Sequence, residues 1–408
     1  MILAIFGIGV ALGPLIGGAI VNSTTWRWVF YLNLPIGGAS LIIMFLFLHV
    51  NYNREMSFKQ KIKRIDLIGN GILMAGTVAV LYSLTYAGTL FSWSSWHTLV
   101  PWLLGFLGIF LFVGYEVSGF AAEPVMPVRL FANRTSLIVI LNTFLNSVLY
   151  FWYLYFLPAI ALFSTPRTGY SLLLQAIAGI PGAAVAAVLL NKYGKFKPLH
   201  LAGFATTTLG MGILSLQHEG TAIAAWAAFQ CVTALGIGMI IDTLLPAFQA
   251  PITETDQAAA TAAWSFVRAF GTIWGVAIPA AIFNNRVDDL LGTVSDLGAR
   301  QLLANGGAYQ QASASFVKQY DIPVQTEIRT VYREALKRVF LIGIAFGGLA
   351  TLLVLLEREV PLRQELETEY GLKPGDQKQS DKDIELKKKT AETKVAGGGS
   401  MQAVTASN

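Results

Sequence analysis

LIGNGILMAGTVAVLYSLTYA, residues 67–87, decides the fold class of this chain. The stretch contains no Asp, Glu, Lys, Arg or His. As an α-helix it would be about 32 Å long, which matches the ~30 Å hydrocarbon core of a bilayer. An outer-membrane β-strand would instead be about ten residues long and would alternate apolar with polar side chains. The stretch therefore predicts a transmembrane α-helix.

Apolar runs of similar length lie on both sides of this stretch. They are continuously apolar, so the backbone can satisfy its hydrogen bonds within the lipid only as helices. The chain is predicted to be an all-α integral membrane protein with about ten transmembrane helices. The expected spans are residues 3–21, 29–50, 67–87, 99–117, 136–156, 170–190, 199–216, 222–245, 258–283 and 336–356.

The overall composition agrees with a membrane location. Of the 408 residues, 54% are hydrophobic and only 13% are charged, whereas a soluble domain carries roughly 25% charged residues. The formal net charge is +5, but the basic residues lie between the apolar runs and do not form one soluble basic face. The lipid bilayer is therefore the expected partner, and nucleic acid is not.

The Lys and Arg residues predict the orientation, because they accumulate in short cytoplasmic loops. With Met1 inside, the short outer loops hold only Arg27 and Arg167, and both termini are cytoplasmic. Two local exceptions remain: the inner loop 250–257 is acidic, and Lys337 and Arg338 open the last span on its outer side. The inner loops hold Arg54, Lys59, Lys61, Lys63, Arg64, Arg129, Arg134, Lys192, Lys195 and Lys197.

The first span contains the glycine-rich stretch GVALGPLIGG, residues 9–18. Glycines at four-residue spacing form a groove in which another helix backbone can approach closely. Proline removes one backbone hydrogen bond and permits a bend. Simple helix packing accounts for this pattern as well as a transport function does. The residues concerned are Gly9, Gly13, Pro14, Gly17 and Gly18.

This stretch resembles the antiporter motif in the fifth helix of the major facilitator superfamily. The following sequence WRWVFYLNLPIG, residues 26–37, resembles the junction of helices five and six in the fungal fourteen-helix drug:proton antiporters. The matching residues of this junction are Trp26, Arg27, Trp28, Asn33 and Pro35.

Further similarities to the same family follow along the chain up to about residue 285. They are Asp66 with Gly69, EPVMPVRLFANR at 123–134, NKYGKFKP at 191–198, PAFQAP at 246–251 and FVRAFG at 266–271. The resemblance implies that the ten spans correspond to helices five to fourteen and that the first four are absent. A truncated gene model, or a partial clone, explains this absence better than a functional ten-helix relative does.

The resemblance also implies a division of the chain. Residues 1–50 would be the last two helices of the N-terminal bundle, 51–65 a basic cytoplasmic loop, 66–118 two central linking helices and 119–135 a cytoplasmic loop. Residues 136–283 and the last span, 336–356, would form the C-terminal bundle. The polar segment 284–335 is expected to be an outer loop with room for short helices. Residues 357–408 are expected to be a disordered cytoplasmic tail, because they include few large apolar residues.

Asp242 and Arg268 are the ionisable residues that stand out within the predicted spans. A charge inside a bilayer costs on the order of 3 kcal/mol on insertion scales, so such residues are functional candidates. The two could pair across neighbouring helices and take up and release a proton during transport. A structural ion pair, or an Asp242 that reaches the cytoplasmic surface, is the alternative. The family commonly has a neutral residue near position 242.

Asn142, Asn146, Tyr150 and Tyr153 are spaced by four, four and three residues and therefore share one face of a helix. By resemblance this helix lines the central cavity of the family, so the four residues are candidate substrate contacts. Interhelical hydrogen bonding explains the pattern equally well. Gln175 in the next span is a weaker candidate of the same type.

The sequence offers little for an enzyme, a cofactor or a metal. Cys231 is the single cysteine, and the four histidines fall at different span ends without metal-ligand spacing. Phosphate-binding loops, nucleophile elbows and zinc-protease patterns are missing from the sequence. We therefore expect no cofactor, no metal site and no enzymatic activity. The histidines are His49, His97, His200 and His218.

These observations together favour a secondary transporter. The expected activity is proton-coupled efflux of small hydrophobic or amphipathic organic molecules, as in multidrug resistance, by alternating access. Uptake of a siderophore or nutrient is an alternative within transport, and an inactive fragment of a longer transporter is a second one. The protein is expected to be a monomer in the plasma membrane, with protons and the organic substrate as its small-molecule partners.

Overall fold

The computed structural model describes residues 13, 16, 17, 19, 20, 23–47, 66–88, 90–121, 123–160, 165–218 and 221–362. The chain divides into two compact units. One unit holds residues 20–61 and 365–408, and the other holds 1–19 and 62–364. In the described part of both, regular secondary structure is helical, and a single bridge between Ala87 and Phe91 is the sole β-type pairing.

The smaller unit contains helices α2 (Arg27–Tyr31) and α3 (Asn33–Phe47). Pro35 has no backbone N–H for the Tyr31 carbonyl, which accounts for the interruption between the two helices. The Asn33 amide donates to the Val29 carbonyl at 3.0 Å across this interruption. The side chains of Trp26 and Phe30 are in edge contact, and Arg27 lies 4.8 Å from the Trp26 ring.

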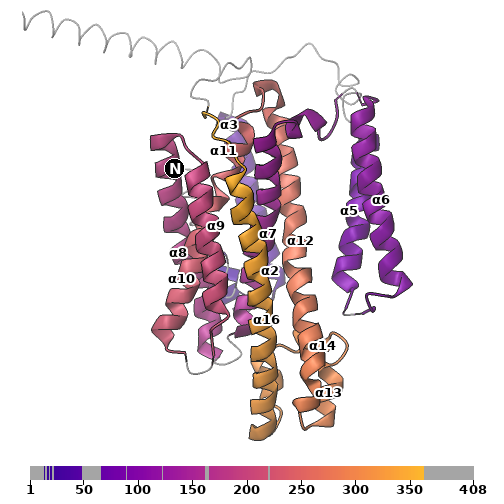
Figure 1. The fold of residues 1–408 in the computed structure, drawn as a ribbon, viewed down its shortest axis with the longest axis vertical. Helices are drawn as coiled ribbons and strands as arrows, with labels where there is room; N and C mark the ends of the chain where they lie inside the picture. The colour runs from indigo at the N-terminus through magenta and orange to yellow at the C-terminus, as the bar shows by residue number, and fades with distance from the viewer. Residues whose placement is uncertain are drawn as a thin grey trace, which may run out of the picture. The chain divides into compact units, whose positions relative to one another are not determined.

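The larger unit begins with a helical hairpin, α5 (Leu67–Tyr86) and α6 (Trp96–Ser118). The Asp66 carboxylate accepts the backbone N–H of Gly69 at 2.8 Å and so caps the start of α5. Tyr115 of α6 donates to the same carboxylate at 3.3 Å. These contacts tie the two helices together at one end, as Figure 1 shows for their labelled ribbons.

The helices from α7 onward form the bundle of this unit (Figure 1), and α10 with α11 is one span interrupted by a break. α12 packs on α7, α10 packs on α8 and α9, and α16 packs on α9, α7 and α12. Their buried apolar side chains form one continuous core. The helices are α7 (Arg134–Ile160), α8 (Thr165–Tyr193), α9 (Lys197–Leu214), α10 (Ile223–Ile241), α11 (Leu244–Gln249), α12 (Gln257–Leu290) and α16 (Ile322–Leu355), with short turns η1 (Val128–Phe131) and η3 (Glu254–Asp256).

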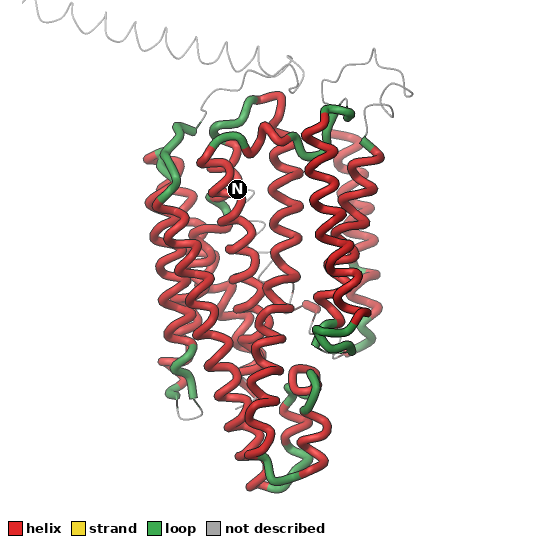
Figure 2. Tube along the Cα trace, turned by 45° about the vertical axis from the view of Figure 1, so that its right-hand side comes forward, coloured by secondary structure: helices red, strands yellow, loops and turns green. Residues whose placement is uncertain are grey.

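The polar segment between α12 and α16 is largely helical. It contains η4 (Leu291–Thr293), α13 (Leu297–Leu303), α14 (Gly307–Gln310) and α15 (Ala314–Val317), joined by the loops that Figure 2 colours green. The Glu327 carboxylate accepts the Ser295 N–H at 2.7 Å, and Tyr332 donates to the Ala308 carbonyl at 3.2 Å. The segment is therefore fixed against the start of α16.

Seven helices in the described residues are long and apolar enough to cross a membrane. The first predicted span, 3–21, lies mostly outside those residues. Among the described residues of α8, the stretch Ile177–Tyr193 is apolar. α9 has only 18 residues and begins with Lys197 and His200, which lowers its apolar content.

Glycines allow α12 to lie directly against α7. A methyl group on Gly275 would lie 2.5 Å from the Val148 carbonyl oxygen, and one on Gly271 would lie 2.8 Å from the Phe144 carbonyl oxygen. Because both obstacles are backbone atoms, neither can move away cheaply. The two glycines are one helical turn apart and form the small-residue seam that lets membrane helices approach closely.

We expect Gly275→Leu to separate α12 from α7 and to lower the free energy of unfolding by about 3 kcal/mol or more, at the upper end of overpacking effects. The measurement is the midpoint of thermal unfolding of the detergent-purified protein, followed by fluorescence-detected size exclusion. Gly348→Leu on α16 is the matched control, since a methyl group there has no neighbour within 4 Å. Equal midpoints for the two variants would contradict the packing described here.

Candidate functional site

Four polar side chains from four different elements come together inside the bundle. They are Tyr150 of α7, Gln175 of α8, Asp242 at the end of α10 and Arg268 of α12. All four are half-buried. Gln175 lies close to the Tyr150 hydroxyl, and its side-chain oxygen has no hydrogen-bond partner among the described residues. The charge of Arg268 acts on both Tyr150 and Asp242. We refer to these four residues as the central polar cluster.

Arg268 is held on its own helix by an aromatic ring. Its guanidinium carbon lies 5.2 Å from the centroid of the Trp264 ring, one turn earlier on α12. A planar guanidinium over an indole face is a favourable cation–π arrangement. Trp264 therefore positions the cation, while Asp242 supplies a nearby negative charge.

Asp242 lies at a break in a membrane-spanning segment. α10 ends at Ile241 and α11 begins at Leu244, with Asp242 as the C-cap of α10. Pro246 has no N–H to donate to the Asp242 carbonyl, which explains the break. The Thr243 hydroxyl donates to the Ile240 carbonyl at 2.9 Å and so satisfies part of the interrupted ladder. Such broken helices place polar backbone and a carboxylate together inside the lipid-embedded region.

The other predicted substrate contacts on α7 point to different neighbours. Tyr153 is fully buried, and its hydroxyl donates to the Gln230 carbonyl of α10 at 3.2 Å. Asn142 is also fully buried, and its amide donates to the Glu357 carboxylate at 3.0 Å. Asn146 is 5% exposed, and its side-chain oxygen has no partner among the described residues. Of the four residues on this face, only Tyr150 belongs to the central polar cluster.

A second polar group, which sequence reasoning missed, ties the end of α16 to α7 and α9. The Nδ1 of His200 lies 2.8 Å from a carboxylate oxygen of Glu357, and both side chains are completely buried. Asn142 donates to the other carboxylate oxygen. Lys197 donates from Nζ to the carbonyls of Leu355 and Glu357 at 3.0 and 2.7 Å. These contacts fix residues at the start of the predicted tail, 357–408, against the bundle.

Gln230 was also missed by the sequence reasoning. Its side chain is completely buried in α10, and neither amide atom has a partner in the part of the chain that the structure describes. The amide in the run WAAFQCV was a detectable signal, since polar residues are rare in such a run. Glu357 gave no comparable signal, because it follows the last apolar residue of its span.

The glycine-rich motif lies mostly beyond the described residues. Gly9, Pro14 and Gly18 fall outside them, and methyl groups on Gly13 and Gly17 would meet nothing within 4 Å. The junction residues Trp26, Arg27, Trp28, Asn33 and Pro35 belong to the smaller unit, in or beside α2 and α3.

One exception to the predicted charge pattern has a structural partner. Asp256, from the acidic loop 250–257, accepts two hydrogen bonds of 2.7 Å from the Arg129 guanidinium. Arg129 belongs to the EPVMPVRLFANR stretch, so this bidentate pair joins that stretch to the acidic loop. Within the described ranges, no three His, Cys, Asp or Glu side chains are grouped so that they could hold a metal ion.

Comparison with known proteins agrees with the helical membrane architecture. Residues 1–276 match the family model of the Major Facilitator Superfamily. The chain is 56% identical over 388 residues to the MFS-type transporter TwmF of Talaromyces wortmannii, covering 93% of this chain and 71% of the relative.

Two further fungal relatives have names that specify efflux. The chain is 42% identical to the MFS-type efflux transporter ffsH of Aspergillus flavipes, covering 91% of this chain and 67% of the relative. It is also 42% identical to the MFS efflux transporter aclA of Aspergillus oryzae, covering 90% and 67% respectively. The chain thus spans about two thirds of the length of these two relatives. Together with its apolar helices, these matches show that the chain belongs to the Major Facilitator Superfamily and is a multi-pass membrane transporter.

Proposed function

We propose that this protein exports small organic molecules in exchange for protons by alternating access. The observation that carries the proposal is the central polar cluster, in which a carboxyl, a guanidinium, a phenol and an amide converge from four elements of an apolar bundle. Helices can pack against one another without charged side chains, and each charge costs on the order of 3 kcal/mol to insert into the bilayer.

Asp242 and Arg268 are the proposed proton-coupling residues. A proton on Asp242 removes the negative charge that acts on Arg268. Arg268 then has a stronger interaction with other partners, such as the Tyr150 hydroxyl, on which it also acts. A proton can therefore change which neighbour holds Arg268, and a difference of this kind between two states is what couples a ligand to a conformational change.

Tyr150 and Gln175 are the proposed substrate contacts of the cluster. Each offers hydrogen bonding beside the predominantly apolar side chains of the bundle. A site of this type suits hydrophobic or amphipathic organic molecules with a few polar groups. Asn142 and Tyr153 lie on the same helix, but their hydrogen-bond partners favour a role in holding helices together. Asn146 stays a proposed contact, because its side-chain oxygen has no partner among the described residues.

The proposed exporter also has an expected division into bundles, a membrane location and an orientation. We assign α7 to α12 and α16 to the C-terminal bundle, and α5 and α6 to the linking helices. The bilayer of the plasma membrane is the proposed location, with the basic loops and both termini cytoplasmic. A monomer without nucleic-acid partners is sufficient for this function. Two of the relatives are named efflux transporters, which supports export of the substrate over uptake.

The test is transport by everted membrane vesicles that contain the expressed chain. With an imposed proton gradient, we expect the vesicles to accumulate a hydrophobic fluorescent dye, and an uncoupler should abolish the accumulation. Vesicles without the chain are the control. Accumulation that persists with the uncoupler would contradict proton coupling, and a signal equal to that of the control vesicles would contradict transport by this chain.

The two tyrosines of α7 provide a matched test of the substrate contact. We expect Tyr150→Phe to raise the apparent KM for the dye about tenfold, the effect of one lost hydrogen bond to a bound group. Tyr153→Phe should leave KM unchanged and should destabilise the fold by about 1 kcal/mol, because the hydroxyl bonds the Gln230 backbone. An unchanged KM in Tyr150→Phe with a raised KM in Tyr153→Phe would instead indicate a substrate site near α10.

A further inference from the structure

A small cleft lies between the end of α9 and the first half of α16, away from both polar groups described above. It is shallow and open to the surface, and its space of about 220 Å³ includes open solvent. Two of its lining residues are cations one helical turn apart on α16, Arg333 and Lys337. The full lining is Leu214, Ser215, Gln217, Arg333, Leu336, Lys337 and Phe340.

Gln217 is the unusual member of this lining. It is 9% exposed, and neither its amide nitrogen nor its amide oxygen has a hydrogen-bond partner among the residues that the structure describes. A buried amide without hydrogen-bond partners destabilises the fold, and a ligand that pairs with it relieves this penalty. This side chain therefore has an unused donor and an unused acceptor beside two positive charges.

Arg333 and Lys337 are not neutralised by the acidic side chains described near them, so both can bind an anion. Arg333 has one ion pair, a 3.5 Å contact with the adjacent Glu334, whose side chain is 38% exposed. Ser215 donates its hydroxyl proton to the Gly212 carbonyl at 2.6 Å, so its oxygen can still accept a hydrogen bond. A contact of 3.5 Å with an exposed acid neutralises little of the Arg333 charge.

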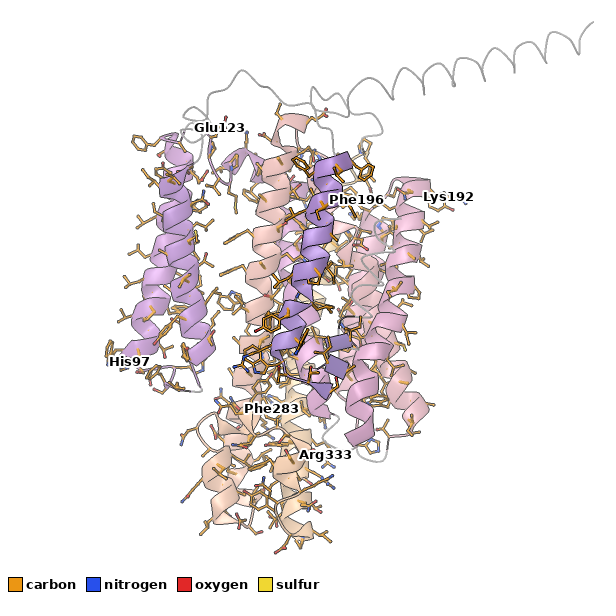
Figure 3. The ribbon with its side chains drawn as sticks, turned by 180° about the vertical axis from the view of Figure 1, so that it is seen from behind. His97, Glu123, Lys192, Phe196, Phe283 and Arg333 are labelled. Atoms are coloured by element: carbon orange, nitrogen blue, oxygen red, sulfur yellow. The ribbon has the colours of Figure 1, made fainter. Side chains whose placement is uncertain are left out.

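The position along α16 places the cleft at the depth of lipid headgroups. Lys337 and Arg333 lie 18 and 22 residues before Leu355, which corresponds to about 27 and 33 Å of helix. This is close to the ~30 Å thickness of the hydrocarbon core. Figure 3 shows Arg333 toward the end of the bundle opposite to Phe196, which adjoins the Glu357 end of α16.

The apolar surface continues from the cleft toward the middle of α16. Leu341 is one turn beyond Lys337 and is 45% exposed. This exposed leucine offers a surface for an acyl chain. Arg and Lys are the usual ligands of phosphate oxygens.

From these observations we infer that this cleft binds the phosphate group of an anionic phospholipid. Arg333 and Lys337 contact the phosphate oxygens, and the Gln217 amide bonds the phosphate and a hydroxyl of the headgroup. The bound lipid bridges α9 and α16. The site also accounts for the exception to the charge pattern at Lys337, and it is independent of the proposed proton coupling.

The test is binding of dioleoyl phosphatidylglycerol to the purified full chain, measured by native mass spectrometry and by the shift in thermal midpoint. Inorganic phosphate and dioleoyl phosphatidylcholine are tested in parallel. The double variant Arg333→Gln with Lys337→Gln should bind phosphatidylglycerol about tenfold more weakly or worse, the loss expected for charge-assisted hydrogen bonds. Arg338→Gln is the matched control, since Arg338 is an exposed neighbouring cation that does not line the cleft.

Gln217→Leu is a second variant that keeps the cations, and it should also weaken binding while stabilising the empty protein. Stabilisation by phosphatidylglycerol and not by phosphate supports a lipid headgroup site, whereas competition by inorganic phosphate assigns the cleft to free phosphate and overturns the lipid. The proposal would also be overturned if the double variant and Arg338→Gln lost the same affinity for phosphatidylglycerol, or if phosphatidylcholine bound as tightly as phosphatidylglycerol.

Discussion

Glu357→Ala is expected to lower the free energy of unfolding by about 3 kcal/mol, because it removes one partner of a buried, charged hydrogen-bonded group. His200 and Asn142 would both lose the carboxylate that they contact at 2.8 and 3.0 Å. All three side chains are almost completely buried, so water cannot replace the lost bonds easily. The thermal midpoint of the detergent-purified protein measures the effect.

Two variants control this result. Glu334→Ala removes the same type of residue from α16 where it is 38% exposed, and we expect it to change stability by less than about 1 kcal/mol. Combining His200→Leu with Glu357→Met replaces both partners by apolar groups, which should recover much of the loss. An unchanged midpoint in Glu357→Ala would show that residues after Leu355 do not hold α16 to α7 and α9.

Arg268→Ala is expected to reduce proton-driven transport at least about a hundredfold, since both charged and polar neighbours in the cluster lose their cation. Arg268→Lys should retain part of the activity, because it keeps the charge and loses the planar group that stacks on Trp264. Asp242→Asn should leave dye binding intact and abolish its dependence on the proton gradient. Initial rates of dye accumulation in everted vesicles measure these effects.

The matched control for Arg268 is Arg286→Ala on the same helix. Arg286 is 37% exposed and lies 3.6 Å from Asp289 near the end of α12. Arg286 is outside the predicted span, and we expect the Arg286→Ala variant to transport the dye at the rate of the unaltered protein. Uncoupler-sensitive transport by Arg268→Ala at an unreduced rate would remove Arg268 from the coupling mechanism.

The sequence predicted helix type well, and helix ends less well. Residues 67–87 were predicted as a span and α5 covers Leu67–Tyr86, because Asp66 marks the start with a side-chain cap. α12 continues to Leu290 and α16 begins at Ile322, well beyond the predicted apolar limits. Hydropathy marks where a helix leaves the lipid, and the backbone can remain helical in water beyond that point.

Part of the candidate site was also predictable. Tyr150, Gln175, Asp242 and Arg268 are polar residues in apolar runs, and that rarity alone made them candidates. The sequence suggested only that Asp242 and Arg268 could pair, because their charges are opposite and both lie in predicted spans. It could not suggest the other contacts, because periodicity relates residues within one helix and not between helices. Asn142 shows the limit most clearly. Its partner Glu357 is 215 positions away in the chain, and no pattern within one helix links the two.

The proposed transport requires that the central polar cluster face a passage that water and substrate can enter. The single cysteine allows a direct test, because Cys231→Ser gives a background without thiols. Gln175→Cys places a thiol in the cluster, and Ile177→Cys places one on the same helix at a position that is 65% exposed on the bundle surface. A charged, membrane-impermeant methanethiosulfonate is then applied to the protein in vesicles. We expect the cysteine at position 175 to react and the dye to slow this reaction, whereas the cysteine at position 177 should be inert in lipid. An inert thiol at 175 together with a reactive thiol at 177 would show that the cluster does not face such a passage.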